Sequence, residues 1–196
     1  MNLSRGLRNN NPLNIRHSAD HWEGARIEQT DKSFVQFVSM AYGYRAAWKV
    51  LDTYCLIFRR ERKPYTLRNI IARWAPPSEN DTDAYVRSVV KLSGLGGNEN
   101  MSRPLRAGRY LENTARLIAA MTCVENGIAY KDVDWEAIWK GYDLAFPGKR
   151  LEKQQVLKGG NPIVEQPFSL PKTKPDEFQD WDEYLDWSSG DVLKAM

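Results

Sequence analysis

The stretch that decides the fold is RWAPPSENDTDAY, residues 73–85. Before its two prolines, apolar residues recur at helical spacing over residues 66–74, and Thr66 is placed to cap that helix. The prolines end it, because neither ring donates a backbone hydrogen bond and the second disfavours helical geometry at the first. A second helix is predicted to begin at Asp81 or Thr82.

The elbow between these two predicted helices carries Glu79 and Asn80. A segment that is fixed at both ends can hold a carboxylate in one place, as acid–base chemistry requires. The alternative is that Glu79 is a solvated loop acid or helps to cap the helix that follows. The residues of the elbow leave both interpretations open.

Length and composition predict a globular chain with one core and an appendage. Of its 196 residues, 42% are hydrophobic, including seven Trp and nine Tyr. No apolar run approaches the length of a membrane span, so no membrane partner is expected. The first eight residues lack an apolar signal core, which predicts synthesis in the cytoplasm without a signal peptide.

The charge is divided unevenly along the chain. Residues 151–196 carry five Lys and nine acids, a net −4, so the whole-chain charge of +3 leaves +7 for residues 1–150. A basic body suits an anionic polymer such as nucleic acid or the bacterial cell wall. We predict a helical domain over residues 1–150 and a Pro-rich linker with an acidic tail over residues 151–196. Aromatic residues alternate with acids in residues 176–191, which predicts docking on a partner or on the basic body.

The remaining pattern of residues 1–150 predicts a mainly α fold with a small hairpin. Apolar residues recur at helical spacing over residues 40–60 and 108–126, and Asp134 is placed to cap one more helix. Residues 5–24 are rich in Asn and turn formers, which favours an ordered loop. Residues 25–38 are predicted to form a β-hairpin around a turn.

Neither the cysteines nor the histidines indicate a metal or cofactor site. Cys55 and Cys123 both fall in apolar helical patterns, which predicts two reduced core thiols. His17 and His21 are four residues apart, but no third ligand accompanies them, whereas zinc needs three or four protein ligands.

Two stretches resemble the signatures of a family of phage and prophage virion proteins. They are RGLRNNNPLNIR at residues 5–16, followed by Trp22 and Gly24, and WAPPSEN at residues 74–80, followed by Thr82 and Tyr85. With Phe34, Phe37, Gly43, Arg45 and Ala46, the match covers about residues 5–95. Members are described as phage structural proteins, and some resemble cell-wall hydrolases. The resemblance implies a virion location, with residues 176–191 contacting other virion proteins.

The order of these features also resembles the glucosaminidase group of the lysozyme superfamily, which implies a lysozyme-like helical domain. In that group the catalytic Glu lies in a helix before the Asn-rich loop, whereas this sequence begins at that loop. Either Glu79 supplies the acid from the elbow, or the domain has lost catalysis.

The first functional hypothesis is a peptidoglycan hydrolase, either a muramidase or a lytic transglycosylase. Glycosidic cleavage needs a carboxylic acid to protonate the leaving oxygen. Glu79, if partly buried beside Trp74, would supply it. Asp31, or Glu28 in the same predicted hairpin, would supply a second carboxylate; a transglycosylase can manage with one. The residues expected to bind the glycan are Asn11, Trp22, Asn80 and Tyr85.

The rival hypothesis is a virion structural component that uses a lysozyme-like domain without catalysis. A nucleic-acid-binding module ranks well behind both, because the basic body carries no recognised nucleic-acid motif. We rank the hydrolase narrowly above the structural component.

Overall fold

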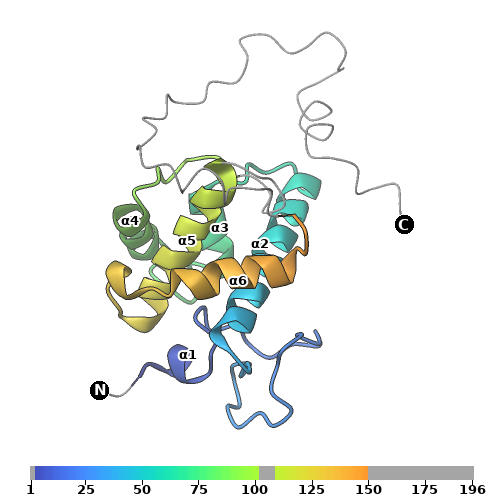
Figure 1. The fold of residues 1–196 in the computed structure, drawn as a ribbon. Coiled ribbons are helices and arrows are strands. Elements are labelled where there is room, and N and C mark those ends of the chain that lie inside the picture. Colours follow the sequence, from blue (N-terminus) through green and yellow to red (C-terminus); the bar gives the residue numbers. More distant parts are fainter. Residues whose placement is uncertain (1–2, 102–108, 150–196) are drawn as a thin grey trace, which may run out of the picture. The chain divides into compact units, whose positions relative to one another are not determined.

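The computed structural model describes residues 3–101 and 109–149. Its helices are α1 (Arg5–Arg8), α2 (Met40–Arg60), α3 (Leu67–Trp74), α4 (Thr82–Ser93), α5 (Arg109–Asn126), the 3₁₀ turn η1 (Tyr130–Asp132) and α6 (Trp135–Ala145) (Figure 1). Within the described ranges, β-structure is limited to isolated bridges, so the predicted mainly α fold is confirmed. The predicted linker and acidic tail, residues 151–196, lie outside these ranges, and what was expected of them stays a prediction.

The helix starts that the sequence predicted are present, and side chains cap them. Thr66 accepts a hydrogen bond from the Asn69 backbone N–H at 3.3 Å. Asp81 and Asp134 accept equivalent bonds at the starts of α4 and α6, each at 2.9 Å. A cap of this kind contributes about 1 kcal/mol to stability, because it satisfies a backbone donor that the helix cannot.

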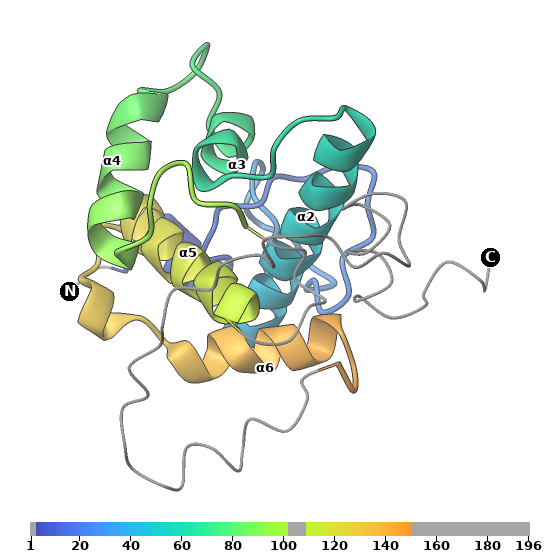
Figure 2. The same ribbon diagram turned by 90° about the horizontal axis from the view of Figure 1, so that it is seen from above.

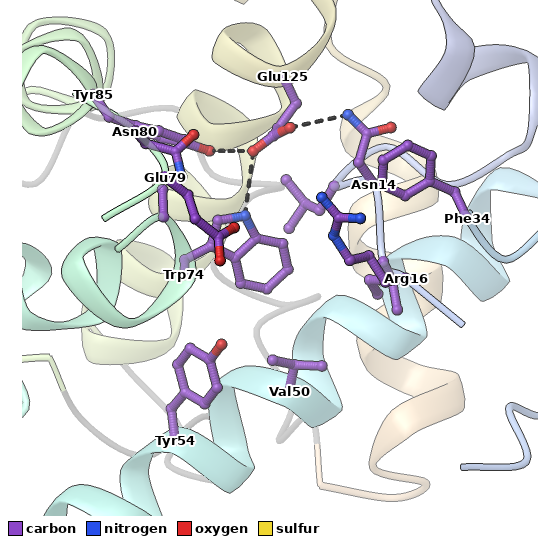
Figure 3. A pocket seen from close by; sticks show the side chains of 13 residues that line it. Asn14, Arg16, Phe34, Val50, Tyr54, Trp74, Glu79, Asn80, Tyr85 and Glu125 are labelled. Carbon is purple, nitrogen blue, oxygen red and sulfur yellow. Dashed lines mark hydrogen bonds between the residues drawn. The ribbon is translucent and has the colours of Figure 1, made fainter. Parts of the chain in front are cut away.

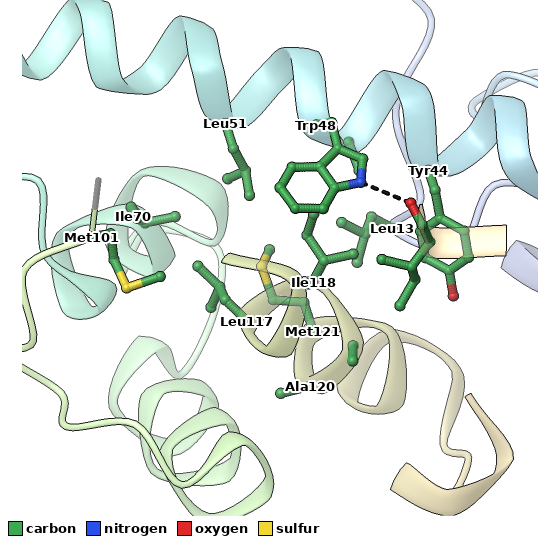
Figure 4. Packing of buried hydrophobic residues seen from close by; sticks show 14 of the residues in the cluster. Leu13, Tyr44, Trp48, Leu51, Ile70, Met101, Leu117, Ile118, Ala120 and Met121 are labelled. Carbon is green, nitrogen blue, oxygen red and sulfur yellow. Dashed lines mark hydrogen bonds between the residues drawn. The ribbon is translucent and has the colours of Figure 1, made fainter. Parts of the chain in front are cut away.

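The core surrounds α5, which lies between α4 and α6 in the view from above (Figure 2). Residues 117–121 are all buried with no exposed surface. Five consecutive buried positions exceed one helical turn of about 3.6 residues, so other elements must cover this part of α5 on every side. Figure 4 shows Leu117, Ile118 and Met121 of α5 facing Trp48 and Leu51 of α2.

Helices α2 and α6 cross at very close range. Trp48 donates from its indole Nε1 to the carbonyl of Ile138 at 3.0 Å, and its ring meets Tyr142 edge to face at 5.0 Å between centroids. At the same crossing, a Cβ on Gly141 would lie 2.8 Å from the carbonyl oxygen of Ala41. Only glycine lets the two backbones approach this closely.

The predicted hairpin at residues 25–38 does not form as a pair of regular strands. One antiparallel bridge joins Ala25 to Phe37, and side-chain amides take over the remaining pairing. The Gln36 backbone N–H donates to Oε1 of Gln29 at 2.7 Å, and Oε1 of Gln36 accepts from the Thr30 backbone at 2.6 Å. Because these side chains satisfy the backbone groups, the segment closes as a loop rather than as a ladder.

The Asn-rich segment is an ordered loop, as predicted, but it begins with the short helix α1. Ser4 caps this helix by accepting from the Leu7 backbone at 3.3 Å. The buried amide of Asn11 then holds the loop together, since it accepts from the Ile15 N–H and donates to the carbonyls of Ile15 and Val35, each at 2.8 Å. The loop is therefore fixed where it faces the ends of α3 and α5.

Candidate functional site

A cavity of about 420 Å³ opens where the Asn-rich loop, α2, the elbow after α3, α4 and α5 meet. Figure 3 shows its polar lining gathered around the indole of Trp74. The lining residues are Leu13, Asn14, Ile15, Arg16, Phe34, Val50, Tyr54, Trp74, Ala75, Glu79, Asn80, Tyr85 and Glu125. The elbow and the Asn-rich loop, which the sequence singled out separately, thus share one cavity.

The carboxylate of Glu125, in the last turn of α5, accepts hydrogen bonds from three different parts of the fold (Figure 3). Tyr85 donates its O–H to Oε1 at 2.8 Å, and Trp74 donates its indole N–H to the same oxygen at 3.2 Å. Asn14 donates from Nδ2 to Oε2 at 2.9 Å. Three donors fix the direction of the carboxylate, and hydrogen bonds to a charged acceptor are about twice as strong as neutral ones.

The elbow positions two of these three donors. Trp74 ends α3 and Tyr85 lies in the first turn of α4. Between them, Thr82 donates its hydroxyl to the carbonyl of Ala75 at 2.6 Å, and the N–H of Glu79 bonds to the carbonyl of Pro76 at 2.9 Å. These bonds close the elbow on itself, so the two donor side chains are held in a fixed relation to each other.

The third donor is positioned by the residue that follows the carboxylate. Asn126 donates from Nδ2 to the carbonyl of Pro12 at 2.7 Å, and its Oδ1 accepts from the Ser4 hydroxyl at 2.6 Å. These bonds fasten the end of α5 to the Asn-rich loop. Asn14, which has a left-handed φ of 50°, thereby comes within reach of Glu125.

Burial raises the pKa of Tyr85 well above its usual value, and the neighbouring charge of Glu125 raises it further. The phenol therefore keeps its proton throughout the neutral range. It therefore remains a hydrogen-bond donor to Glu125 over that range.

Of the residues that the sequence put forward, the structure brings Glu79, Asn80 and Tyr85 to this cavity. Glu79 is exposed at its edge, so the expectation of a partly buried acid beside Trp74 is wrong. The reason is that the elbow after the prolines is open to solvent, since residues 77–81 are all exposed.

Asp31 does not line the cavity and instead ties the Asn-rich loop to the segment at residues 25–38. Its two oxygens accept from Nε and Nη2 of Arg5 at 2.6 Å each, and from Asn9 at 2.7 Å. The backbone N–H groups of Ser33 and Phe34 add bonds at 2.9 and 3.0 Å. The Arg5 guanidinium, helped by these other donors, holds the pKa of Asp31 well below its usual range.

The other expected site residues also lie away from the cavity lining. Asn11 is fully buried, and its side-chain amide bonds to the backbone of the loop. Trp22 is half-buried against a small cluster that includes Val35 and Phe37. Glu28 is exposed on the 25–38 segment.

No metal centre emerges from the described part of the chain. There, no group of three or more His, Cys, Asp or Glu side chains is placed to hold an ion. His17 lies with Nε2 at 2.9 Å from the carbonyl of Asp31, and within the described residues neither Cys55 nor Cys123 is in a disulfide. The part of the chain that the structure describes also contains no helix that is long and apolar enough to cross a membrane.

Comparison with known proteins gives a phage relative. The chain is 35% identical over 148 residues to Protein P5 of Pseudoalteromonas phage PM2, and the match covers 74% of this chain and 84% of that protein. It belongs to the Protein P5 family. No family model matches the chain. This relationship makes the chain a phage protein, in agreement with the phage part of the sequence resemblance.

Sequence reasoning missed Glu125, the best-anchored acid in the cavity of this member of the Protein P5 family. The apolar stripe predicted for α5 runs through Ala115, Ile118 and Met121, and Glu125 is four residues further along the same face. An acid on the core-facing stripe of a helix is a signal of a paired or functional carboxylate. That signal can be seen in the sequence, but the sequence does not show which residues bond to the carboxylate.

Proposed function

We propose that this phage protein is a virion-associated peptidoglycan hydrolase that cleaves glycan strands in the manner of a muramidase or lytic transglycosylase. The observation that carries the proposal is the Glu125 carboxylate, which three side-chain donors hold against a cavity whose edge bears a second carboxyl group, Glu79. A pair of carboxyl groups beside one cavity is the arrangement that most glycoside hydrolases use, and a transglycosylase needs only one of them.

In this proposal the two acids have different roles. Glu79, on the exposed elbow, protonates the glycosidic oxygen. The Glu125 carboxylate stabilises the positive charge that develops on the sugar ring, because its donors already orient it and no reorganisation is needed. Trp74 lies between them and offers an aromatic face to a sugar ring.

The fold supports this proposal through the place of Glu125 relative to the Asn-rich loop. The lysozyme-superfamily resemblance implies a catalytic Glu at a helix that comes before such a loop. Here α5 comes later in the chain, yet Asn126 bonds to Pro12 and Asn14 bonds to Glu125, so a glutamate at a helix end meets the loop in space. This supports a catalytic carboxylate that is supplied from α5.

The test is turbidity loss of purified peptidoglycan with the full chain and three variants. Glu79→Gln and Glu125→Gln should each lower the rate by about 100-fold or more, the range expected for a lost acid or charge stabiliser. Glu28→Gln is the matched control, because Glu28 is exposed and does not line the cavity, and it should keep the wild-type rate. A wild-type chain that releases no sugar fragments from peptidoglycan would refute the proposal.

The second candidate is a non-catalytic virion component. It is favoured by the same three bonds, since they join the Asn-rich loop, α3 and α4 to α5 and would stabilise a building block that never cleaves anything. In that case Glu125→Gln lowers the free energy of unfolding but changes no activity, because there is none to change. Its expected contacts with other virion proteins, through residues 176–191, lie outside the described residues.

A further inference from the structure

The cavity has a positive side, formed by Arg16. Its guanidinium lies over the ring of Phe34, 5.3 Å from the ring centroid. Within residues 3–101 and 109–149, it makes no hydrogen bond or ion pair with another side chain. Arg16 is exposed and lines the cavity, so a ligand in the cavity can reach it.

The backbone at Arg16 is held by hydrogen bonds, so the position from which its side chain extends is fixed. Arg16 and Phe34 form an antiparallel bridge. The neighbouring Ile15 is held by Asn11 on both its N–H and its carbonyl, each at 2.8 Å, and its carbonyl also accepts from the Val35 N–H at 3.0 Å. Because the backbone of Arg16 is fixed and its guanidinium is stacked on an aromatic ring, the side chain loses less conformational entropy when it binds an anion.

A second arginine beside the same ring is already occupied. The guanidinium of Arg5 lies 4.6 Å from the Phe34 centroid, but both oxygens of Asp31 accept from it at 2.6 Å. The carboxylate of Asp31, the acid beside this ring, is thus paired with Arg5. The charge of Arg16 is left for a ligand.

The opposite side of the cavity is negative, with Glu79 and Glu125 among its lining residues (Figure 3). A strand with a phosphate at every unit would place like charges against these acids, which costs free energy. A neutral sugar that carries one carboxylate on a substituent fits better, because its ring can lie by the acids while its carboxylate reaches the guanidinium. Arginine matches a carboxylate with two parallel hydrogen bonds.

We propose that Arg16 forms an anion subsite that binds the carboxylate substituent of an acid-bearing glycan and so selects such strands over neutral ones. The proposal rests on the proposed function for the glycan itself. It adds the substrate class that the cavity prefers: a β-1,4-linked amino-sugar strand with lactyl or peptidyl carboxylates, rather than a chitin-like strand without them.

The test measures binding by calorimetry, with Glu79→Gln in every sample to prevent cleavage. The two probes are a tetrasaccharide that contains muramic acid and the neutral chitin tetrasaccharide, which share a backbone and differ in the lactyl carboxylate. The acidic probe should bind about tenfold more tightly, the factor expected for one charge-assisted contact. Adding Arg16→Gln should reduce the two affinities to about the same value, whereas Arg16→Lys should retain part of the difference.

Arg87→Gln is the matched control, because Arg87 is exposed on α4 and does not line the cavity; it should leave both affinities unchanged. Equal binding of the two probes, or a preference that survives Arg16→Gln, would overturn the subsite while leaving the hydrolase proposal intact. If neither sugar binds, the hydrolase proposal itself fails, and the subsite fails with it. A single-stranded oligonucleotide that binds more tightly than the acidic sugar through Arg16 would likewise overturn the proposal.

Discussion

Replacing Asp31 with Asn tests what holds the Asn-rich loop in place. The Asp31 side chain is 9% exposed and accepts five hydrogen bonds, two of them on Oδ2, from Arg5 and from the buried Asn9. An Asn side chain has one oxygen, so it can keep the bonds to Oδ1 but turns an N–H₂ group toward the donors at Oδ2.

The expected cost follows from these contacts. The bond from Asn9 is lost outright, and a hydrogen bond to a charged group contributes about 1.5–3 kcal/mol. The half-exposed Arg5 pair adds little, because water screens it. We therefore expect a loss of about 2–3 kcal/mol in the free energy of unfolding, or about 5–10 °C in Tm for a domain of this size.

The pH dependence of this loss has a definite sign. Asp31 has a lower pKa in the folded protein than its unfolded value of about 3.9, chiefly because Arg5 donates to it. A lowered folded pKa stabilises the fold fully above the unfolded pKa, and the stabilisation disappears as the pH falls through the folded value. Urea unfolding should show a constant difference between wild type and Asp31→Asn from about pH 5 to 8, which shrinks below about pH 4.

The control and the functional readout complete this experiment. Asp20→Asn changes an exposed acid whose carboxylate, among the described residues, accepts from Ser18 alone, so it should shift stability by less than about 0.5 kcal/mol. At 25 °C, where Asp31→Asn stays folded, its peptidoglycan cleavage should be close to wild type. An unchanged unfolding free energy would refute the structural argument, and a loss of cleavage of about 100-fold would restore Asp31 as a catalytic carboxylate.

Three further changes test the fold and the cavity. Tyr85→Phe removes the O–H that donates to Glu125 at 2.8 Å and should lower the unfolding free energy in urea by about 1 kcal/mol; no change would mean that water replaces the phenol without loss. Gly43→Ala places a Cβ against the carbonyl oxygen of Asn10 and should cost about 1–3 kcal/mol in thermal unfolding; a more stable variant would show that the contact relaxes freely. Trp48→Phe loses the bond to a buried α6 carbonyl and leaves a void, so it should lower the free energy of unfolding by about 2–4 kcal/mol, measured by calorimetry. A loss below about 1 kcal/mol would contradict the packing described for α2 and α6.

The helices and their ends were determined locally, which is why the sequence predicted them well. Thr66, Asp81 and Asp134 each cap a helix through a donor three residues away. Such bonds depend only on nearby residues and on the spacing of apolar side chains. The elbow follows for the same reason, since two prolines end a helix whatever surrounds them.

The segment at residues 25–38 shows where local pattern was insufficient. Phe34 and Phe37 are three residues apart and would face opposite sides of a strand, while residues 35–37 are all buried. The side-chain amide of Gln29 bonds to both the N–H and the carbonyl of Gln36, so the chain closes without a ladder. Whether a side-chain amide or a partner strand satisfies a backbone group depends on the conformation of the whole loop. The spacing of apolar residues carries no information about that conformation.

The sequence by itself placed Glu79 on the elbow and predicted the helix that carries Glu125, although not the role of that residue. Only the tertiary structure brought Asn14, Trp74 and Tyr85 to Glu125, across separations of 111, 51 and 40 residues. Helical spacing fixes which face a side chain occupies, because that is set within one turn. Which distant residue meets that face is set by how the helices pack on one another, and this depends on the shape of the whole core.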